Sequence, residues 1–230
     1  MSSFKHIKHI FFDLDHTLWD FDKNSEIAFQ FIFKDLFPEL EISKFIAIYA
    51  PINQACWKLY QNNLITHEEL RYKRLADSFS ELNMKVSDEL ITIISDEYIS
   101  HLPNSNHLFE GCVETLEYLH KNYKLHIITN GFAEVQFKKL NNSGIYHFFD
   151  TVTNSEMAGV KKPNAQIFNH ALTIANAAKN ESIMIGDCLD ADVGGALNFG
   201  IDAIFFNVNA TEVAQPIKQI SNLVELKKLF

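Results

Sequence analysis

Two acidic residues that directly follow an apolar segment are the feature of this sequence with the clearest chemical potential. Asp13 and Asp15 stand two positions apart, immediately after the segment His9–Phe12, whose composition suits a buried strand. Neighbouring carboxylates repel each other and raise each other's pKa. A cation must therefore compensate them, and the polar residues at other strand ends indicate which cation it is.

Three further polar groups stand at the ends of apolar segments or just beyond them. They comprise a hydroxyl beside a flexible glycine, a lysine restrained by a following proline, and a second set of acids. In chain order these groups are Thr129-Asn130-Gly131, Lys161-Lys162-Pro163, and Gly186-Asp187 with Asp190 and Asp192. Each group alone is more typical of an ordinary turn or loop, so its significance depends on the fold that positions it.

The apolar segments that position these groups alternate with segments of helical periodicity. Short uninterrupted apolar strands between helices are typical of a parallel sheet covered on both faces. The predicted strands are His9–Leu14, Leu125–Thr129, Phe148–Thr153, Ile183–Asp187 and Ala203–Asn207. The predicted helices between them are Ala133–Asn142, Ala165–Ala178 and Ala191–Phe199.

The carboxyl edge of this predicted sheet is where ligands bind in open parallel sheets. The acids, Thr129 and Lys162 should therefore meet there. Oxygen ligands without a His or Cys cluster favour a hard cation, and Mg²⁺ is the natural choice. Such a site would accept a phosphate group, whose oxygens Lys162, the Thr129 hydroxyl and nearby backbone N–H groups would hold.

The segment between the first two predicted strands has a different character. From about residue 25 to residue 99 it is nearly free of glycine and shows repeated helical periodicity. Thr66 followed by Glu69 has the pattern of a capping box and predicts the start of a helix. We therefore predict an α/β protein with a Rossmann-like parallel-sheet core and an inserted all-helical second domain.

Composition excludes several classes of function. The 230 residues are 47% hydrophobic and include 20 Phe, enough to fill a substantial core. A net charge of -9 argues against a nucleic-acid partner, whose phosphates require a basic surface. No segment approaches the roughly 20 apolar residues of a membrane span. The three cysteines stand far apart without a CxxC pair, so we expect free thiols and a cytoplasmic protein. With nucleic acid and membrane excluded, the expected partner is a small molecule.

The four groups occur in one order along the chain, and in this the sequence resembles the haloacid dehalogenase (HAD) superfamily over essentially its full length. The first motif is Asp13-Leu14-Asp15-His16-Thr17, the second Thr129, the third Lys162 before Pro163, and the fourth Gly186-Asp187 to Asp192. The resemblance implies a catalytic core formed by residues 1–20 and 102–230, and a helical cap domain formed by residues 21–101. In finer detail, DLDHTLWDFDKNS, ITHEELRYKRL and TNGF resemble the pyrimidine-nucleotide 5′-nucleotidase branch.

The resemblance also implies a role for each motif residue. Asp13 would be the nucleophile that forms an aspartyl-phosphate, and Asp15 would protonate the leaving oxygen and then activate water. Dehalogenases lack an acid at the position of Asp15, so its presence argues for phosphatase chemistry. His16 departs from the glycine of the common family form. Catalysis would also use Thr129 and Lys162; the metal ligands would be Asp13, the Asp15 backbone carbonyl, Asp187 and Asp192; and phosphate would be bound by Thr129, Asn130, Gly131 and Lys162.

The expected reaction is Mg²⁺-dependent hydrolysis of a phosphate monoester, and the expected substrate is a pyrimidine nucleoside 5′-monophosphate. The alternatives are a small sugar or acid phosphate such as phosphoglycolate, a phosphomutase reaction, and a non-catalytic binding protein, against which the four retained motifs speak. The cap should choose the substrate, with Asn53, Trp57, Tyr60 and Arg71 as candidates, although helix packing is the favoured role of Trp57 and Tyr60. We expect a monomer or a small homo-oligomer.

Overall fold

The protein divides into two compact units. The computed structural model describes residues 4–213 and 216–230. The first unit, the core, comprises Met1–Asp20 and His107–Phe230, and the second, the helical unit, comprises Phe21–Asn106. An α/β core with an inserted all-helical cap domain, as predicted, is therefore confirmed.

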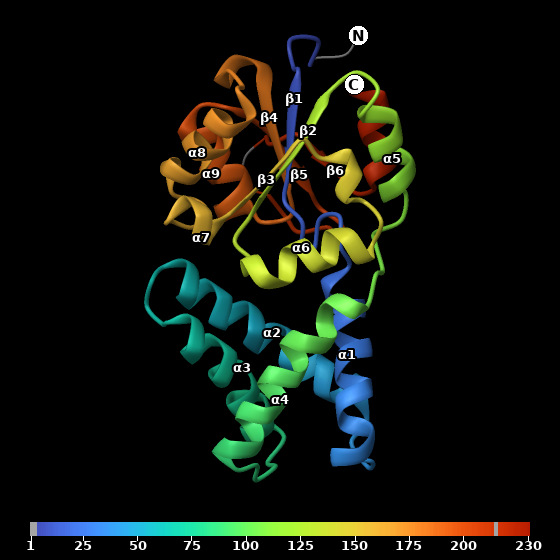
Figure 1. The fold of residues 1–230 in the computed structure, drawn as a ribbon, viewed down its shortest axis with the longest axis vertical. Coiled ribbons are helices and arrows are strands. Elements are labelled where there is room, and N and C mark those ends of the chain that lie inside the picture. Colours follow the sequence, from blue (N-terminus) through green and yellow to red (C-terminus); the bar gives the residue numbers. More distant parts are fainter. Residues whose placement is uncertain (1–3, 214–215) are drawn as a thin grey trace. The chain divides into compact units, whose positions relative to one another are not determined.

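A six-stranded parallel sheet forms the centre of the core, with the strand order β3-β2-β1-β4-β5-β6 (Figure 1). The central strand β1 pairs with β2 on one side and β4 on the other, and Phe12 stands opposite both Ile127 and Ile185. The carboxyl ends of these three strands therefore finish at the same level. The strands are β1 His9–Phe12, β2 Lys124–Thr129, β3 Thr151–Asn154, β4 Ser182–Gly186, β5 Asp202–Phe206 and β6 Gln219–Ile220.

Alternate residues of the strands supply the apolar contacts that hold helices onto the sheet. Phe11, Met184 and Phe205 belong to one buried cluster with Phe168 of α8 and Ala196 of α9. Because side chains alternate across a strand, the neighbours of Phe11 in β1 face the other side, where α5 lies (Figure 1). The core helices are α5 Cys112–Leu119, α6 Ala133–Asn142, α7 Ser155–Ala158, α8 Ala165–Ala175 and α9 Gly195–Phe199. Short 3₁₀ helices of the core span Tyr146–Phe148, Lys179–Glu181 and Leu223–Lys228. Another 3₁₀ helix, Leu102–Asn104, belongs to the helical unit.

Some predicted elements differ from the observed ones. The segment Phe148–Thr153 begins as a 3₁₀ turn, and strand β3 starts only at Thr151, because an apolar run alone does not distinguish a buried turn from a strand. The predicted helix Ala191–Phe199 is a π-helix, Leu189–Gly194, followed by the short helix α9. The two-residue strand β6 was not expected from the sequence.

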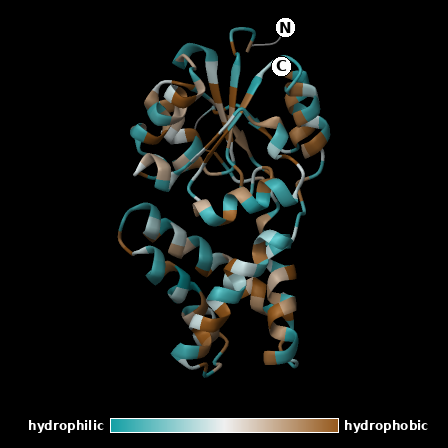
Figure 2. Ribbon diagram, in the orientation of Figure 1, coloured by the Kyte–Doolittle hydropathy of each residue, from teal (hydrophilic) through white to brown (hydrophobic). Residues whose placement is uncertain are grey.

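The helical unit is built from four helices around a cluster of aromatic rings. Phe29 of α1 lies within 4.8 Å of the rings of Phe45, Tyr49 and Tyr98, which come from α2 and α4. Hydrophobic and hydrophilic residues alternate along these helices, as expected where one face is buried (Figure 2). The helices are α1 Phe21–Leu36, α2 Ile42–Gln61, α3 His67–Glu81 and α4 Asp88–His101.

Local contacts mark the start of α3 and the end of α4. Thr66 and Glu69 form the expected capping box, each side chain bonding the other's backbone N–H, at 3.2 and 2.7 Å. Helix α4 continues directly into the 3₁₀ helix, whose Leu102 and Pro103 are buried. Residues 102–106 therefore group with the helical unit, whereas the sequence places the boundary after residue 101.

Two stacked histidines in the first two strands give the core a titratable element away from the acids. The His9 Nδ1 and His126 Nε2 atoms lie 3.0 Å apart, and His126 Nδ1 lies 2.9 Å from the Thr151 hydroxyl. Burial lowers the pKa of His126 to about 4 and also lowers the pKa of His9. The folded protein therefore keeps the His126 ring neutral at pH values where an unfolded chain protonates it.

The free energy of unfolding should fall as the pH is lowered from about 6.5 to about 4. The unfolded state takes up a proton near pH 6.5 and the folded state does not, so the contribution of His126 is complete above that pH and is lost on acidification, by up to about 3 kcal/mol. Urea unfolding between pH 4 and 7.5 measures this loss. The slope should be shallower in His126→Gln, and equal slopes in the two proteins would contradict the assignment.

Candidate active site

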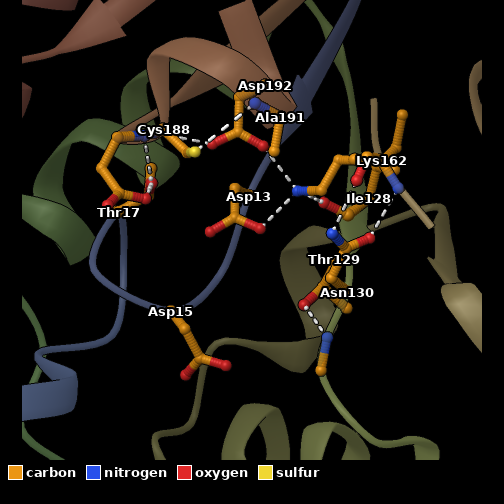
Figure 3. Close-up of polar contacts among 12 residues, drawn as sticks. Asp13, Asp15, Thr17, Ile128, Thr129, Asn130, Lys162, Cys188, Ala191 and Asp192 are labelled. Atoms are coloured by element: carbon orange, nitrogen blue, oxygen red, sulfur yellow. Dashed lines mark hydrogen bonds and ion pairs between the residues drawn. The ribbon is translucent and has the colours of Figure 1, made fainter. Parts of the chain in front are cut away.

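The carboxyl edge of the sheet brings together residues from four separate parts of the chain (Figure 3). Asp13 follows β1 directly, and its N–H donates to the Ile185 carbonyl of the neighbouring strand at 2.9 Å. Asp187 follows β4, and Asp192 lies on the π-helix that comes after it. One carboxylate oxygen from each of these three acids lies within 4.8 Å of the others. We call Asp13, Asp187 and Asp192 the acid cluster.

Lys162 is the buried cation of this site. Its side chain is 2% exposed, and its ammonium donates to Asp13 Oδ1 at 2.5 Å and to the Ile128 carbonyl at 2.6 Å. It also lies 2.7 Å from Asp192 Oδ1. Burial alone would lower the pKa of Lys162, but the charges of Asp13 and Asp192 and their hydrogen bonds raise it, so the side chain stays charged.

One lysine does not balance three acids. Burial raises the pKa of Asp13 well above its usual range, Lys162 lowers it, and the charges of Asp192 and Asp187 raise it again. Burial and the charge of Asp192 likewise raise the pKa of Asp187. The cluster consists of hard carboxylate oxygens and repels itself, and such a donor set could hold a hard divalent cation.

Hydrogen bonds orient the two acids that follow β4. The Thr17 hydroxyl donates to Asp187 Oδ1 at 3.2 Å and accepts the Asp187 N–H at 3.1 Å. Asp192 Oδ2 accepts the Cys188 N–H at 3.0 Å. Thr17 was part of the first sequence motif without an assigned role, and the structure shows that it positions Asp187. Asp190 is exposed and stands outside the acid cluster.

The segment after β2 connects to Lys162 through its backbone. The Asn130 amide donates to the Lys162 carbonyl at 3.0 Å and accepts the Lys162 N–H at 2.7 Å, so this side chain holds the loop that carries the lysine. The Thr129 hydroxyl is buried and accepts the Gly131 N–H at 3.0 Å. The predicted phosphate-binding residues Thr129, Asn130, Gly131 and Lys162 thus form one connected structure.

Asp15 lies apart from the acid cluster, with its carboxylate turned away from that of Asp13 (Figure 3). Its two oxygens accept from Lys139 at 2.5 Å and from Gln136 at 3.1 Å. Sequence reasoning predicted the helix that carries these two residues but missed them. Their spacing of three positions places them on one face of that helix, but the sequence does not show what that face meets. His16 next to Asp15 has a φ of 63°, a left-handed conformation that explains why glycine is the common residue at this position.

The candidate specificity residues all lie in the helical unit. Asn53 is buried, and its Oδ1 accepts from Arg74 at 3.2 Å and from the Tyr49 hydroxyl at 3.4 Å. Arg71 pairs with Asp96 at 2.6 Å. Trp57 and Tyr60 contact each other edge to face, with ring centroids 5.7 Å apart. A role in substrate choice therefore stays a prediction for each of them.

The comparisons with known proteins agree with this geometry. Residues 7–200 match the family model described as haloacid dehalogenase-like hydrolase. The pyrimidine 5′-nucleotidase YjjG of Escherichia coli is 33% identical, with 96% of each chain covered. The pyrimidine 5′-nucleotidase PynA of Streptococcus pneumoniae is 31% identical, with 95% of this chain and 93% of that protein covered.

A solved structure extends the comparison to the fold. The HAD hydrolase YfnB of Bacillus subtilis, solved with bound magnesium, is 27% identical and superimposes with a TM-score of 0.88, covering 98% of this chain and 99% of that one. An L-2-haloacid dehalogenase of Xanthobacter autotrophicus shares the fold, with a TM-score of 0.74 at 17% identity over 97% of this chain and 98% of that one.

The chain therefore belongs to the haloacid dehalogenase-like hydrolases. Within this family it is a HAD-type phosphatase with an aspartate cluster at its active site.

Across residues 4–213 and 216–230, no helix has both the length and the apolar character needed to cross a membrane.

Gly186 marks a point in this site where only a hydrogen fits. A Cβ at position 186 would overlap the side chain of Asp192, so Gly186→Ala should displace that carboxylate from Lys162 and from the Cys188 N–H. We expect a loss of about 1–3 kcal/mol in the free energy of unfolding, the usual cost of overpacking.

Urea unfolding of four proteins tests this cause: the wild type, Gly186→Ala, Asp192→Gly and the double variant. Removing the Asp192 side chain should relieve most of the cost of Gly186→Ala. An equal cost in both backgrounds would show that the overlap with Asp192 is not its cause.

Proposed function

We propose that this protein is a Mg²⁺-dependent phosphomonoesterase that hydrolyses pyrimidine nucleoside 5′-monophosphates through an aspartyl-phosphate intermediate. The observation that carries the proposal is the buried Asp13 carboxylate, held by Lys162 at 2.5 Å inside a cluster of three acids. The charge and hydrogen bond of Lys162 favour the ionised form of Asp13 against burial, and an ionised carboxylate is a nucleophile that needs no base to activate it.

In the first half of the reaction, an Asp13 carboxylate oxygen attacks the phosphorus and the ester oxygen of the substrate departs. Lys162 stays charged and offsets the repulsion between the nucleophile and the phosphate. The Thr129 hydroxyl and the backbone N–H of Asn130 bind the phosphoryl oxygens, and the Gly131 N–H joins them by leaving the Thr129 hydroxyl, to which it donates in the free protein. Asp13, Asp187, Asp192 and the Asp15 carbonyl would hold Mg²⁺, which would supply further charge neutralisation.

Asp15 serves both halves of the reaction. It gives a proton to the departing alkoxide, and the same carboxylate then takes a proton from the water that attacks the aspartyl-phosphate. Water hydrolyses the intermediate, so inorganic phosphate leaves and the Asp13 carboxylate is restored. The side chain of Asp15 keeps 21% of its surface exposed, as a group that meets substrate and water must.

The substrate class rests on similarity. Two relatives that match this chain over nearly its whole length, YjjG and PynA, are named pyrimidine 5′-nucleotidases. The second candidate is a small sugar phosphate, since the glyceraldehyde 3-phosphate phosphatase of Methanothermobacter thermautotrophicus is 30% identical over 90% of this chain.

The cysteines Cys56, Cys112 and Cys188 are free thiols, which supports the cytoplasm as the site of action.

A phosphatase screen tests the reaction and the substrate together. With Mg²⁺ present, UMP, dUMP and dTMP should give higher kcat/KM values than AMP, phosphoglycolate and glyceraldehyde 3-phosphate, and EDTA should abolish every activity. Asp13→Asn should lower turnover by at least about 10³-fold, because the nucleophile is lost. A sugar or acid phosphate that exceeds all nucleotides would overturn the substrate class, and unchanged turnover in Asp13→Asn would remove Asp13 from the mechanism.

Magnesium binding has a readout that does not depend on turnover. A cation that binds only the folded protein stabilises it by about 2.7 kcal/mol at one hundred times its Kd, so millimolar Mg²⁺ should raise the melting temperature. Asp187→Asn should abolish most of this rise. Asp190→Asn, which changes an exposed acid outside the acid cluster, should keep it. A rise that persists in Asp187→Asn would place the ion elsewhere.

A further inference from the structure

Two side chains of α6 converge on the carboxylate of Asp15. Lys139 donates to Asp15 Oδ1 at 2.5 Å, and Gln136 donates through Nε2 to Asp15 Oδ2 at 3.1 Å. Each oxygen thus has its own donor. Because a carboxylate held at both oxygens can neither rotate about its last bond nor change rotamer without losing a contact, this pair selects one orientation of Asp15.

The backbone of Asp15 is already fixed by a tight turn. The N–H groups of Thr17, Leu18 and Trp19 all point at the Leu14 carbonyl, at 3.3, 3.0 and 2.9 Å. The His16 N–H donates to the Trp19 carbonyl at 2.9 Å. The freedom left to Asp15 is therefore in its side chain, and that is the part that Lys139 and Gln136 restrain.

Stability is a weak reason for burying Lys139 beside Asp15. Its side chain is 2% exposed, and its ammonium lies 4.1 Å from the centre of the Trp19 ring. Burying a lysine and an aspartate as a pair often contributes no more stability than an apolar residue of similar size would. The pair is also asymmetric, because the lysine is enclosed while 21% of the Asp15 side chain stays exposed. This arrangement presents a restrained carboxylate to whatever enters the site.

Gly131 makes room for the second donor. A Cβ at position 131 would overlap the Gln136 amide, so a residue with any side chain there would push the amide off Asp15. The Thr129-Asn130-Gly131 segment therefore serves Asp15 as well as the loop of Lys162.

We propose that Lys139 and Gln136 are positioning residues that aim the Asp15 carboxylate at the leaving oxygen of the substrate. The inference rests on the proposed function, since it concerns the orientation of Asp15, the group that protonates the leaving alkoxide. Proton transfer requires the acid within hydrogen-bond reach of that oxygen, and it contributes about 10²–10⁴-fold to a rate. If Asp15 loses this orientation, only those reactions whose leaving group needs the proton should become slower.

The test compares two leaving groups in the first turnover. Lys139→Met keeps the length of the side chain and removes the charge, and Lys139→Arg keeps a donor. In rapid-quench experiments Lys139→Met should release uridine from UMP about 10–100-fold more slowly, within the range of general acid catalysis. Release of p-nitrophenolate from p-nitrophenyl phosphate, which needs no proton on the leaving oxygen, should keep nearly its wild-type rate, and the affinity for inorganic phosphate should not change. Lys139→Arg should recover part of the loss.

Two further variants complete the experiment. Lys138→Met, which changes the exposed neighbour of Lys139 on α6, should behave as the wild type. Gln136→Met tests the second donor and decides the question if Lys139→Met does not fold. Equal slowing for both leaving groups, or no slowing for either in a folded variant, would overturn the proposal.

The wild-type protein alone tests the proposed function, so the two failures are distinguishable. If it prefers a sugar phosphate, the same comparison is made with that substrate. If it hydrolyses no phosphomonoester, the proposed function fails, and crystal structures of the wild type and Lys139→Met still test the positioning. Asp15 should occupy one orientation in the first and several in the second, and a single shared orientation would overturn it.

Discussion

The ion pairs of the buried Lys162 ammonium with Asp13 and Asp192 are the interaction on which the active site depends. They bring a lysine from the loop between α7 and α8 to acids that follow β1 and β4. Removing either side of such a buried arrangement leaves an uncompensated charge, which costs several kcal/mol. One lysine among three acids leaves the acid cluster negatively charged. This remaining charge favours the binding of a divalent cation.

The fold alone does not select the reaction. The chain shares its fold with an L-2-haloacid dehalogenase, an enzyme named for a different reaction. What distinguishes this chain lies in individual side chains, above all in Asp15, which has its own donors on α6 and its own opening to solvent. The acid cluster and Asp15 are thus two separately built parts of one site: in the reaction proposed above, the first would receive the phosphate and the second would serve the leaving oxygen.

The sequence was sufficient for the architecture and for the residues at the strand ends, because both follow from strong periodicities. Apolar runs predicted five of the strands, and parallel pairing then required Asp13, Thr129 and Asp187 to lie at one edge. It was insufficient where a side chain's role depends on its direction. Lys139 reads as a surface residue of an amphipathic helix, and nothing local shows that it turns inward to Asp15. The π-helix that presents Asp192 was likewise read as the start of an ordinary α-helix, since both have similar apolar spacing.

The position of β1 in the sheet has a consequence for how the protein is made. This strand lies at the centre of the sheet and precedes both of its partners, which begin only at Lys124 and Ser182. The helical unit is one continuous stretch, Phe21–Asn106, and leaves the ribosome complete before either partner exists. The nascent chain thus carries an apolar strand with two open edges until β2 emerges and one open edge until β4 emerges, a state prone to aggregation and suited to chaperone binding. The central strand of the sheet is therefore completed on both sides only after β4 has been made.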